Sequence, residues 1–342
     1  MQTMATLTRF GTPDAIQIQT TNALPSAPAG MVRVRTEASS VTFTDRLIRM
    51  GVYPDLKATP PFTLGYDCIG RVDQLGAGVT TWQVGQRVAD LTVIGGNARY
   101  LIRPADSLIP VPESLDAAAA ETMVLTYMSA YQMLHRSAQV QAGQRVLVHG
   151  AAGAVGNALL QLATLAQLDV VATGSQASRP LLMRHTPTVL DYRAQDYPQQ
   201  LRQAAGDGFD VVFDGIGGAT TRQSLGLLKP GGMLVFYGMV SALNGVHPEQ
   251  ARGWRSSTAI LGSFAQAALL STLHRRKLTF YSIAALRKQQ PEWFRTDLIH
   301  LFSLLEQQQI VPLIHARYAL PNVAAAHAAL DAGVQGRVVL VA

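Results

Sequence analysis

The sequence predicts a two-domain α/β protein, with a doubly wound parallel sheet in one domain and an irregular β-barrel-like fold in the other. Three observations predict this class. The chain has 342 residues, more than one ordinary hydrophobic core holds. Its first third contains short strand patterns separated by turns rich in Gly and Pro. From about residue 117, helix and strand patterns alternate, and several strands are continuous apolar runs, as in sheets covered by helices on both faces.

The composition favours a large buried core, since 48% of the residues are apolar and only 15% are charged. The net charge is +6, but the densest basic run, residues 274–277, is short, so we expect no nucleic-acid partner. The single cysteine, Cys68, excludes an internal disulfide and a zinc site built from several thiolates. Without a signal-peptide pattern or an apolar run of about 18 residues, we expect a cytoplasmic protein with no membrane partner.

The first domain is expected to span residues 1–118 and to be completed by the tail, residues 290–342. Residues 31–35 alternate apolar and polar side chains, the pattern of a half-buried strand. Residues 70–76 and 85–90 are predicted to be short strand-and-turn units rich in Gly. The tail is predicted to hold helices at 296–308 and 323–331 and strands near 314 and at 337–341.

The second domain is expected to span residues 119–289. It follows a segment, residues 117–136, that is helical in composition and period. Five apolar strands are predicted after it, with a sixth at residues 257–264. The five are residues 145–149, 169–173, 188–192, 209–216 and 232–237.

A strand that runs into regularly spaced glycines and then into an apolar helix predicts a pyrophosphate-binding loop. The glycines permit a tight turn and a close approach of the phosphates, and the helix N-terminus presents free N–H groups to the anion. The pattern is G-x-x-G-x-x-G rather than the commoner G-x-G-x-x-G. The residues predicted to hold the cofactor here are Gly150, Ala151, Ala152, Gly153, Ala154, Val155 and Gly156.

The end of the second strand indicates which nicotinamide cofactor binds. An NAD site places an acidic residue there for the ribose 2′-hydroxyl, whereas this segment has none. We therefore expect NADPH, with its 2′-phosphate bound by Ser175, Ser178 and Arg179, and with Tyr192 as a fourth contact. The alternative is an N-capping loop with a solvated arginine.

Segments dispersed over nearly the whole chain resemble the zinc-free quinone oxidoreductases of the medium-chain dehydrogenase/reductase superfamily, the zeta-crystallin-like group. The segments are VTFTD (41–45), RMGVYP (49–54), PFTLGYD (61–67), GAGVT (76–80), VGQRV (84–88), LT (125–126), HGAAGAVG (149–156), DGIGG (214–218) and GRVVL (336–340). The resemblance implies a GroES-like catalytic domain, a Rossmann domain, reduction of quinones or activated alkenes, and a homodimer.

Zinc alcohol dehydrogenases of that superfamily place a Cys before a Thr-Asp pair and a His in a Gly-His-Glu motif. Here residues 42–45 read Thr-Phe-Thr-Asp and residues 65–67 read Gly-Tyr-Asp, so both ligands are missing. We therefore expect a reductase without a catalytic metal. The quinone reductases usually read Gly-Tyr-Glu, which makes Asp67 a shortened variant.

The resemblance implies two catalytic residues. Tyr53 would lie at the substrate cleft, where its phenol could donate a hydrogen bond to a developing oxyanion or relay a proton; alternatively it packs in its loop. Thr126 would lie close to the nicotinamide, or else bond back to its own helix. Further cofactor contacts are expected after the fifth strand, at Gly238, Met239, Val240 and Ser241, and at Gly262 and Phe264.

Two other functions remain open from the sequence. One is an enoyl-thioester reductase, which would need a site for an acyl carrier or coenzyme A. The other is a non-catalytic NADPH-binding structural or regulatory protein, which would bind the cofactor and turn over no enone or quinone.

Overall fold

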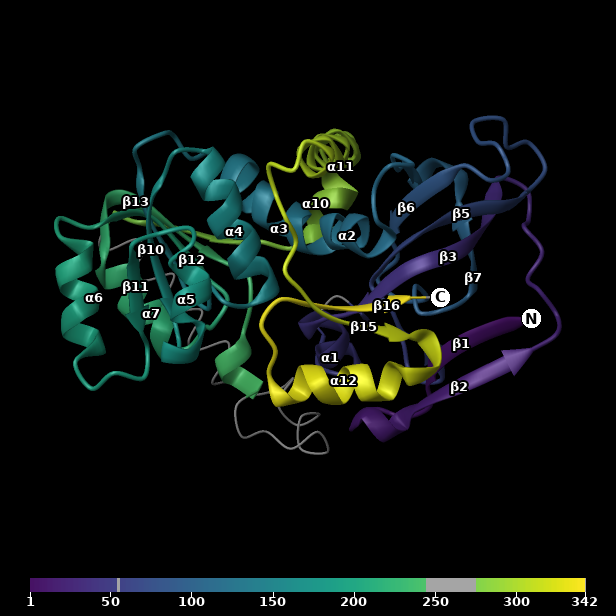
Figure 1. Ribbon diagram of the computed structural model, residues 1–342, viewed down its shortest axis with the longest axis horizontal. Helices are drawn as coiled ribbons and strands as arrows, with labels where there is room; N and C mark the ends of the chain where they lie inside the picture. Colours follow the sequence, from purple (N-terminus) through teal and green to yellow (C-terminus); the bar gives the residue numbers. More distant parts are fainter. Residues whose placement is uncertain (54–55, 244–274, 342) are drawn as a thin grey trace. The chain divides into compact units, whose positions relative to one another are not determined.

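The computed structural model describes residues 1–53, 56–243 and 275–341 (Figure 1). The chain divides into two compact units. The described residues of unit 1 are 1–53, 56–128 and 287–341, and those of unit 2 are 129–243 and 275–286. Unit 2 is therefore inserted, in sequence, between the two parts of unit 1.

Among the described residues, unit 2 contains a six-stranded sheet in the order β11-β10-β9-β12-β13-β14, and all neighbouring strands run parallel. The strand order reverses beside β9, and ligands of such sheets bind outside the carboxyl ends of the strands at that point. The strands are β9 (Arg145–Val148), β10 (Asp169–Gly174), β11 (Thr188–Asp191), β12 (Phe209–Asp214), β13 (Leu228–Phe236) and β14 (Lys277–Phe280).

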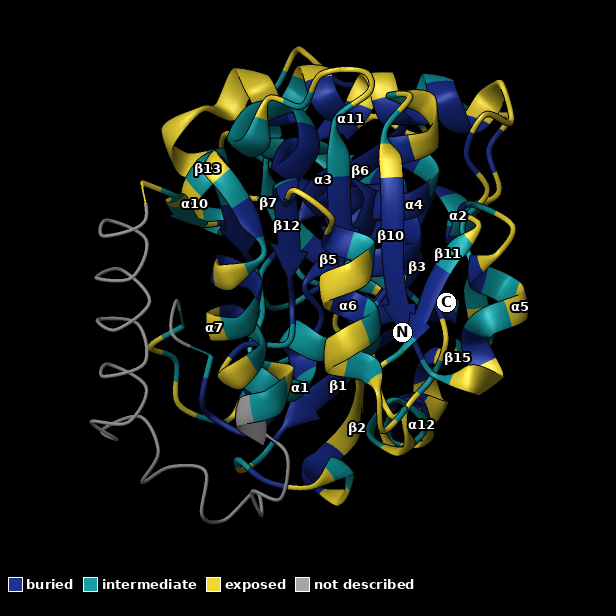
Figure 2. Cartoon of the chain, turned by 90° about the vertical axis from the view of Figure 1, so that its left-hand side faces the viewer, coloured by how far each residue is buried: buried dark blue, intermediate teal, exposed yellow. Residues whose placement is uncertain are grey.

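Helices cover this sheet, which explains its continuous apolar strands. Figure 2 shows β10 and β12 in the colour of buried residues, whereas α6 carries many exposed ones. Leu147, Val171, Val212 and Leu234 share one buried cluster. The helical segments are α3 (Met128–Gln132), η4 (Met133–Ala138), α4 (Ala154–Leu165), η5 (Gln176–Ser178), α5 (Arg179–Leu182), α6 (Tyr197–Ala205), α7 (Ala219–Gly226), η6 (Val240–Leu243) and α10 (Ile283–Gln289).

The sixth strand among the described residues follows the segment predicted for it. The strand beside β13 is β14, whose Lys277–Phe280 pairs with residues 233–236. The predicted strand at residues 257–264 lies outside the described residues. A local pattern does not report which strand pairs with β13, so the sequence alone did not single out residues 277–280.

The described part of unit 1 is built on a seven-stranded sheet and a three-stranded sheet. The long strand β3 is central to the first, because it pairs with β16, β5 and β7. The strands of this sheet share one buried cluster, which includes Val34, Val72, Val88 and Leu101. The strands are β1 (Gln2–Leu7), β2 (Ile16–Thr21), β3 (Met31–Val41), β4 (Phe62–Thr63), β5 (Asp67–Leu75), β6 (Arg87–Leu91), β7 (Tyr100–Pro104), β8 (Ile109–Pro110), β15 (Ile314–Ala319) and β16 (Arg337–Val341).

Two helices of unit 1 begin at side-chain caps that the sequence supplies. Thr42 and Asp45 form a capping box at the start of α1, and Asp116 accepts the N–H of Ala119 at 2.9 Å to begin α2. The helical segments are η1 (Pro13–Ala15), α1 (Phe43–Arg49), η2 (Ala105–Ser107), α2 (Ala117–Thr122), η3 (Met123–Tyr127), α11 (Pro291–Glu306), η7 (Leu320–Asn322) and α12 (Val323–Ala332). Within the described ranges, no helix is both long and apolar enough to cross a bilayer.

Candidate functional site

The glycine-rich loop has the geometry of a phosphate cradle. Gly150 follows β9 with a φ of +62°, and its carbonyl accepts the N–H of Gly153 at 3.0 Å. A Cβ on Gly156 would lie 2.4 Å from the Gly150 carbonyl oxygen and 2.6 Å from the Ala151 Cα. Only glycine therefore lets α4 approach the loop this closely.

The N-terminus of α4 is open to an anion. Gly153 is its N-cap and no side chain caps the helix, so the first-turn N–H groups, including those of Ala154 and Val155, are available to a ligand. Such groups, with the helix dipole behind them, bind phosphate. Ala152 lies in the same turn, so the predicted residues 150–156 form one continuous cradle that fits a pyrophosphate.

A chain of hydrogen-bonding side chains lies behind this cradle. The Gly150 N–H donates to the Thr173 hydroxyl at 3.3 Å, and that hydroxyl lies 3.3 Å from Nδ1 of His149. The other ring nitrogen, Nε2, lies 2.9 Å from the Ser224 hydroxyl. Burial lowers the pKa of His149, which keeps the ring neutral, with one donor and one acceptor nitrogen. Sequence reasoning missed this role, since a histidine on an apolar strand is more often only packed.

The serines after β10 bond to each other. The Ser178 hydroxyl donates to the Ser175 carbonyl at 2.8 Å. The Ser175 hydroxyl in turn donates to the Ser178 hydroxyl at 3.4 Å. Neither side chain caps a helix, contrary to the capping alternative. Arg179 Nη1 donates to the Val189 carbonyl at 2.7 Å, which ties the arginine to β11.

Tyr192 directly follows β11, and its N–H donates to the Gly174 carbonyl at the end of β10, at 3.2 Å. Its side chain is 49% exposed, as a residue that binds a ligand from solvent requires. The exposed Arg193 lies against it, with its guanidinium carbon 5.4 Å from the ring centroid. Sequence reasoning did not select Arg193, although a cation next to Tyr192 was visible there.

The loops after β12 and β13 are tied together at the same edge of the sheet. Asp214 holds the first loop by accepting the N–H of Ile216 at 2.8 Å and the Thr221 hydroxyl at 2.6 Å. The Ser241 N–H then donates to the Ile216 carbonyl at 2.9 Å. A Cβ on Gly238 would lie 2.7 Å from the Gly215 carbonyl oxygen, so the glycine is needed for this approach.

The predicted residues 238–241 therefore occupy the carboxyl end of the parallel sheet, together with the phosphate cradle and residues 174–175. Met239 is partly buried against the sheet core, whereas Val240 is 37% exposed. The remaining predicted contacts, Gly262 and Phe264, lie outside the described residues.

In unit 1, Tyr53 is paired with a second tyrosine. Its phenol oxygen lies 2.7 Å from that of Tyr66. The two rings meet edge to face, with centroids 5.9 Å apart and an interplanar angle of 88°. Tyr66 is fully buried and Tyr53 is half-buried, so the pair connects the interior of unit 1 with a more accessible position.

Thr126 lies in the π-helical turn η3 and is 2% exposed. Its hydroxyl has no hydrogen-bond partner within the part of the chain that the structure describes. It therefore does not bond back to its own helix, unlike Thr122, whose hydroxyl donates to the Ala119 carbonyl at 2.7 Å. A buried hydroxyl without a partner is costly, and π-helical turns are frequent at functional sites, which is consistent with a ligand at Thr126.

Unit 1 also contains a group of buried charged side chains. Arg337 bonds both Asp67 and Glu121, and the Ser40 hydroxyl donates to Asp67 at 2.6 Å. Asp45 is buried as well, and burial raises its pKa to about 7. Burial also raises the pKa of Glu121 well above its usual value. In the described ranges, no group of three or more His, Cys, Asp or Glu side chains could hold a metal ion.

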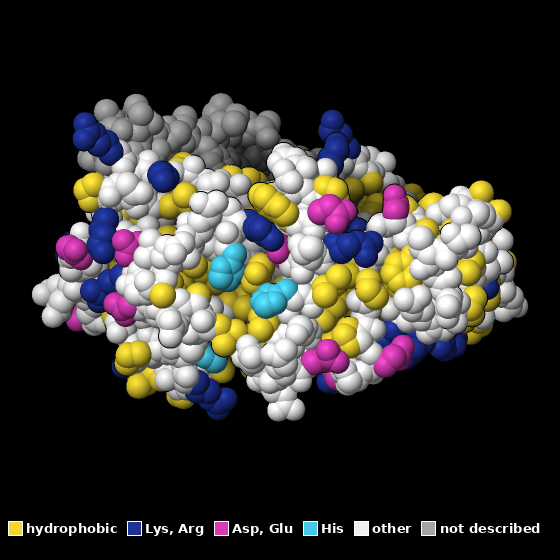
Figure 3. Space-filling view, turned by 90° about the horizontal axis from the view of Figure 1, so that it is seen from above, with side chains coloured by type: hydrophobic (Ala, Val, Ile, Leu, Met, Phe, Trp, Pro, Cys, Tyr) yellow, Lys and Arg dark blue, Asp and Glu magenta, His cyan; other side chains and the backbone are white. Residues whose placement is uncertain are grey.

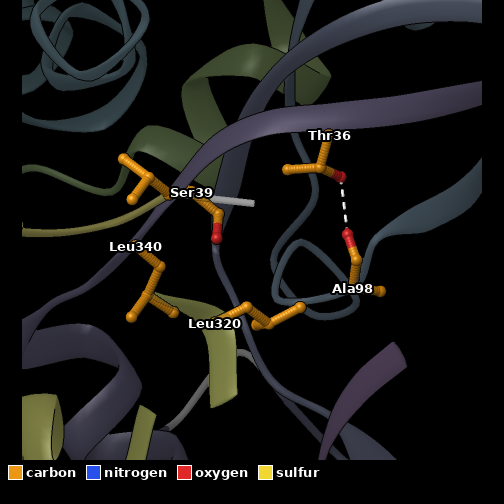
Figure 4. A pocket seen from close by; sticks show the side chains of 6 residues that line it. Thr36, Ser39, Ala98, Leu320 and Leu340 are labelled. Atoms are coloured by element: carbon orange, nitrogen blue, oxygen red, sulfur yellow. Dashed lines mark hydrogen bonds between the residues drawn. The ribbon is translucent and has the colours of Figure 1, made fainter. Parts of the chain in front are cut away.

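A small hollow in unit 1 is lined by Thr36, Ser39, Ala98, Leu320 and Leu340 (Figure 4). The Thr36 hydroxyl crosses it to donate to the Ala98 carbonyl at 2.6 Å. The hollow has no room for a water molecule, so it is a packing gap and not a substrate pocket. On the molecular face in Figure 3, the basic and acidic side chains of the described residues are interspersed.

Two family models match the chain. The alcohol dehydrogenase GroES-like domain matches residues 28–113, and the zinc-binding dehydrogenase domain matches residues 186–340. The synaptic vesicle membrane protein VAT-1 homolog of Rattus norvegicus is 31% identical over 324 residues, which cover 93% of this chain and 78% of that protein. The homolog of Danio rerio is 33% identical over 241 residues, and the chain spans only 50% of its length.

Two relatives carry enzyme names. The quinone oxidoreductase of Rattus norvegicus is 28% identical over 337 residues, which cover 97% of this chain and 95% of that protein. The 2-haloacrylate reductase of a Burkholderia species is 34% identical over 224 residues, which cover 63% of this chain and 66% of that protein. A mycobacterial protein solved in complex with NADPH superposes over the full length of both chains, with a TM-score of 0.84 and 27% identity.

Proposed function

The chain belongs to the zinc-independent quinone oxidoreductase-like group of the medium-chain dehydrogenase/reductase superfamily, and on that premise we propose that it is an NADPH-dependent reductase of quinones or α,β-unsaturated carbonyl compounds. The phosphate cradle at residues 150–156 carries the proposal, because it fits the pyrophosphate of a dinucleotide. The substrate class is supported by the names of two relatives, since a quinone and a haloacrylate are both electron-poor alkenes.

When bound, the reduced nicotinamide supplies a hydride. The chain itself must then hold the substrate oxygen, which gains negative charge as the hydride reaches the conjugated carbon. We assign this work to Tyr53, whose phenol is a neutral donor at ordinary pH. The Thr126 hydroxyl, buried and without a protein partner among the described residues, is proposed to donate to the nicotinamide end of the cofactor.

NADPH is proposed over NADH because of the residues at the ends of β10 and β11. No acidic side chain follows β10 to repel a 2′-phosphate, and Ser175, Ser178 and Arg179 lie there with Tyr192. The exposed guanidinium of Arg193 adds a cation beside Tyr192. Charge-assisted hydrogen bonds from such groups are the ones that phosphate prefers.

A reaction without zinc is proposed from the side chains at the two sequence positions where zinc dehydrogenases carry ligands. The position of the Gly-His-Glu histidine is held by Tyr66, a poor zinc ligand at neutral pH because its phenol is protonated. Asp67 follows it and is bound by Arg337 and Ser40. The Asp67 carboxylate is thus already bonded to other side chains of the protein.

A homodimer is proposed on the exposed end of the parallel sheet. Among the described residues β14 is the last strand of that sheet, and Phe280 on it is 59% exposed. Unpaired strand edges of this kind favour pairing with a second copy. Light scattering coupled to gel filtration would measure the mass, and Phe280→Glu should shift a dimer toward monomer.

The activity is tested by the loss of NADPH absorbance with para-benzoquinone, a linear enone, cyclohexenone and an enoyl thioester, each repeated with NADH. We expect turnover of the quinone or an enone with NADPH preferred. Tyr53→Phe should lower kcat by about 100-fold, as expected for loss of an oxyanion donor. Tyr100→Phe, which removes a hydroxyl on β7, is the matched control.

Turnover of the thioester alone would identify an enoyl-thioester reductase. NADPH binding without turnover of any of the four substrates would identify a non-catalytic protein.

A further inference from the structure

The proposed donor Tyr53 is oriented by another side chain. Its oxygen lies 2.7 Å from the Tyr66 oxygen, the usual length of a direct hydrogen bond between two hydroxyl groups. The perpendicular ring contact fixes the angle at which they meet, and such contacts are favourable for aromatic pairs. Tyr53 thus has two restraints from one neighbour.

The backbone of Tyr66 is itself held firmly. Its carbonyl accepts two N–H groups, from Thr92 at 2.8 Å and from Val93 at 3.0 Å. Val93 adopts a φ of +66°, which is costly for a β-branched residue and persists only where surrounding contacts impose it. The strained residue therefore serves to place a donor on the Tyr66 carbonyl.

The preceding residue is fixed as well. The Thr92 hydroxyl donates to the Gly65 carbonyl at 2.7 Å. A Cβ on Gly65 would lie 2.2 Å from the backbone nitrogen of Asn97, so this turn admits glycine only. With Tyr66 fully buried, both its backbone and its ring have little freedom.

We propose that Tyr66 is a positioning residue for the reaction: its hydroxyl donates a hydrogen bond to the Tyr53 oxygen and so aims the Tyr53 hydroxyl at the substrate oxygen. The inference rests on the proposed function of Tyr53. The direction of the bond follows from burial: Tyr66 lies in the interior, whereas the half-buried Tyr53 is the one of the two that a substrate can reach.

Two consequences follow for the reaction. A phenol that accepts a hydrogen bond becomes a stronger donor, because hydrogen bonds in a chain polarise one another. The bond also removes rotational freedom from the Tyr53 hydroxyl, so the donor is already aligned when charge develops on the substrate oxygen. Tyr66 gives up no proton in this process and does not touch the substrate.

The test is a double-mutant cycle with cyclohexenone and NADPH, in which Tyr53→Phe, Tyr66→Phe and the double variant are compared with the unaltered chain. Tyr66→Phe keeps the ring and its packing, so the fold is retained at the cost of about one hydrogen bond. We expect Tyr66→Phe to lower kcat by about 5- to 10-fold, with KM and the NADPH Kd unchanged. In the Tyr53→Phe background, it should lower kcat no further.

A purely structural role gives a different result. Equal losses of kcat in both backgrounds, or no loss in either, would overturn the assignment of Tyr66. If Tyr53→Phe itself leaves kcat unchanged while the unaltered chain turns over cyclohexenone, the donor role of Tyr53 fails, and the assignment of Tyr66 with it, but the reductase function stands. Tyr100→Phe controls for loss of a hydroxyl elsewhere in unit 1.

Discussion

The guanidinium of Arg193 lies over the ring of Tyr192, with 5.4 Å between its central carbon and the ring centroid. The Tyr192 N–H donates to the Gly174 carbonyl at the end of β10, so this pair lies next to the strand end where we propose that the 2′-phosphate of NADPH binds. Arg179, the arginine that the sequence points to, is instead bonded to the Val189 carbonyl. Substitutions of Arg193 and of Arg179 can therefore be told apart by experiment.

Replacing either arginine should change cofactor selectivity. Arg193→Ala and Arg179→Ala are each expected to raise the NADPH Kd by about tenfold or more, through loss of a bond to a charged phosphate, with little change for NADH. Arg179→Ala should also lower Tm, because it loses the bond to Val189. Fluorescence titration with NADPH and with NADH measures the two Kd values. Arg184→Ala, which removes an exposed arginine, is the control. Equal weakening of NADPH and NADH binding would contradict a 2′-phosphate site.

Gly156→Ala should disrupt the phosphate cradle. The new Cβ would lie 2.4 Å from the Gly150 carbonyl oxygen, so the loop or α4 must move. We expect a cost of about 1–3 kcal/mol in folding and a loss of NADPH affinity of about tenfold or more. Gly226→Ala is the matched control, since a Cβ there meets no atom within 4 Å. Unaltered NADPH binding by Gly156→Ala would show that the cradle does not hold the cofactor.

His327 should make the protein sensitive to acid. It is fully buried, neither ring nitrogen has a partner in the described part of the chain, and burial together with Arg49 lowers its pKa from 6.5 to about 3. At pH values between about 3 and 6.5, His327 binds a proton in the unfolded chain but not in the folded chain. The free energy of unfolding therefore falls as the pH falls. His327→Leu should therefore gain about 2 kcal/mol over the unaltered chain between pH 7.5 and pH 5.

Urea unfolding at the two pH values measures this effect. His315→Leu, which removes an exposed histidine from β15, is the control and should show no such change. A constant difference between His327→Leu and the unaltered chain at both pH values would mean that His327 binds its proton equally well in the folded and unfolded chain.

Arg337 should be essential for unit 1 at alkaline pH. Its guanidinium contacts Asp67 and, at 2.6 Å, Glu121, and all three side chains are buried. Arg337→Met leaves these carboxylates unpaired, which should cost about 3–5 kcal/mol at pH 8. The cost should shrink toward pH 5, because a carboxyl that takes up a proton no longer needs the cation. The exposed pair of Arg317 and Asp116 serves as control, and Arg317→Met should cost about 1 kcal/mol or less.

Local patterns in the sequence predict much of the fold and of the cofactor loop. The strand, glycines and helix at residues 145–165 follow one another along the chain, so spacing alone identifies them. The helix expected at residues 117–136 is interrupted by π-helical turns at 123–127 and 133–138. A single inserted residue in a helix changes the hydrogen bonds but hardly the apolar period, so the pattern does not report it.

The pairing of Tyr53 with Tyr66 is a different case. The two residues are 13 positions apart, and the turn that holds Tyr66 depends on contacts with residues 92–97. Neither residue shows a period, and side-chain direction in a loop follows from tertiary contacts. The strand β14 escaped prediction for the same reason, since its pairing with β13, about 40 residues earlier in the chain, determines it.

The place of β16 in the sheet has a consequence for how a cell makes this protein. β16 pairs with β3 and delivers Arg337 to the buried acids, yet it emerges from the ribosome some 300 residues after β3. The inserted unit 2 is completed earlier and can fold during translation, as domains generally do. Until β16 leaves the ribosome, unit 1 stays incomplete. One edge of β3 is then unpaired, and the carboxylates of Asp67 and Glu121 are exposed to water. Chaperone demand during synthesis should therefore fall on the part of the chain that is made first.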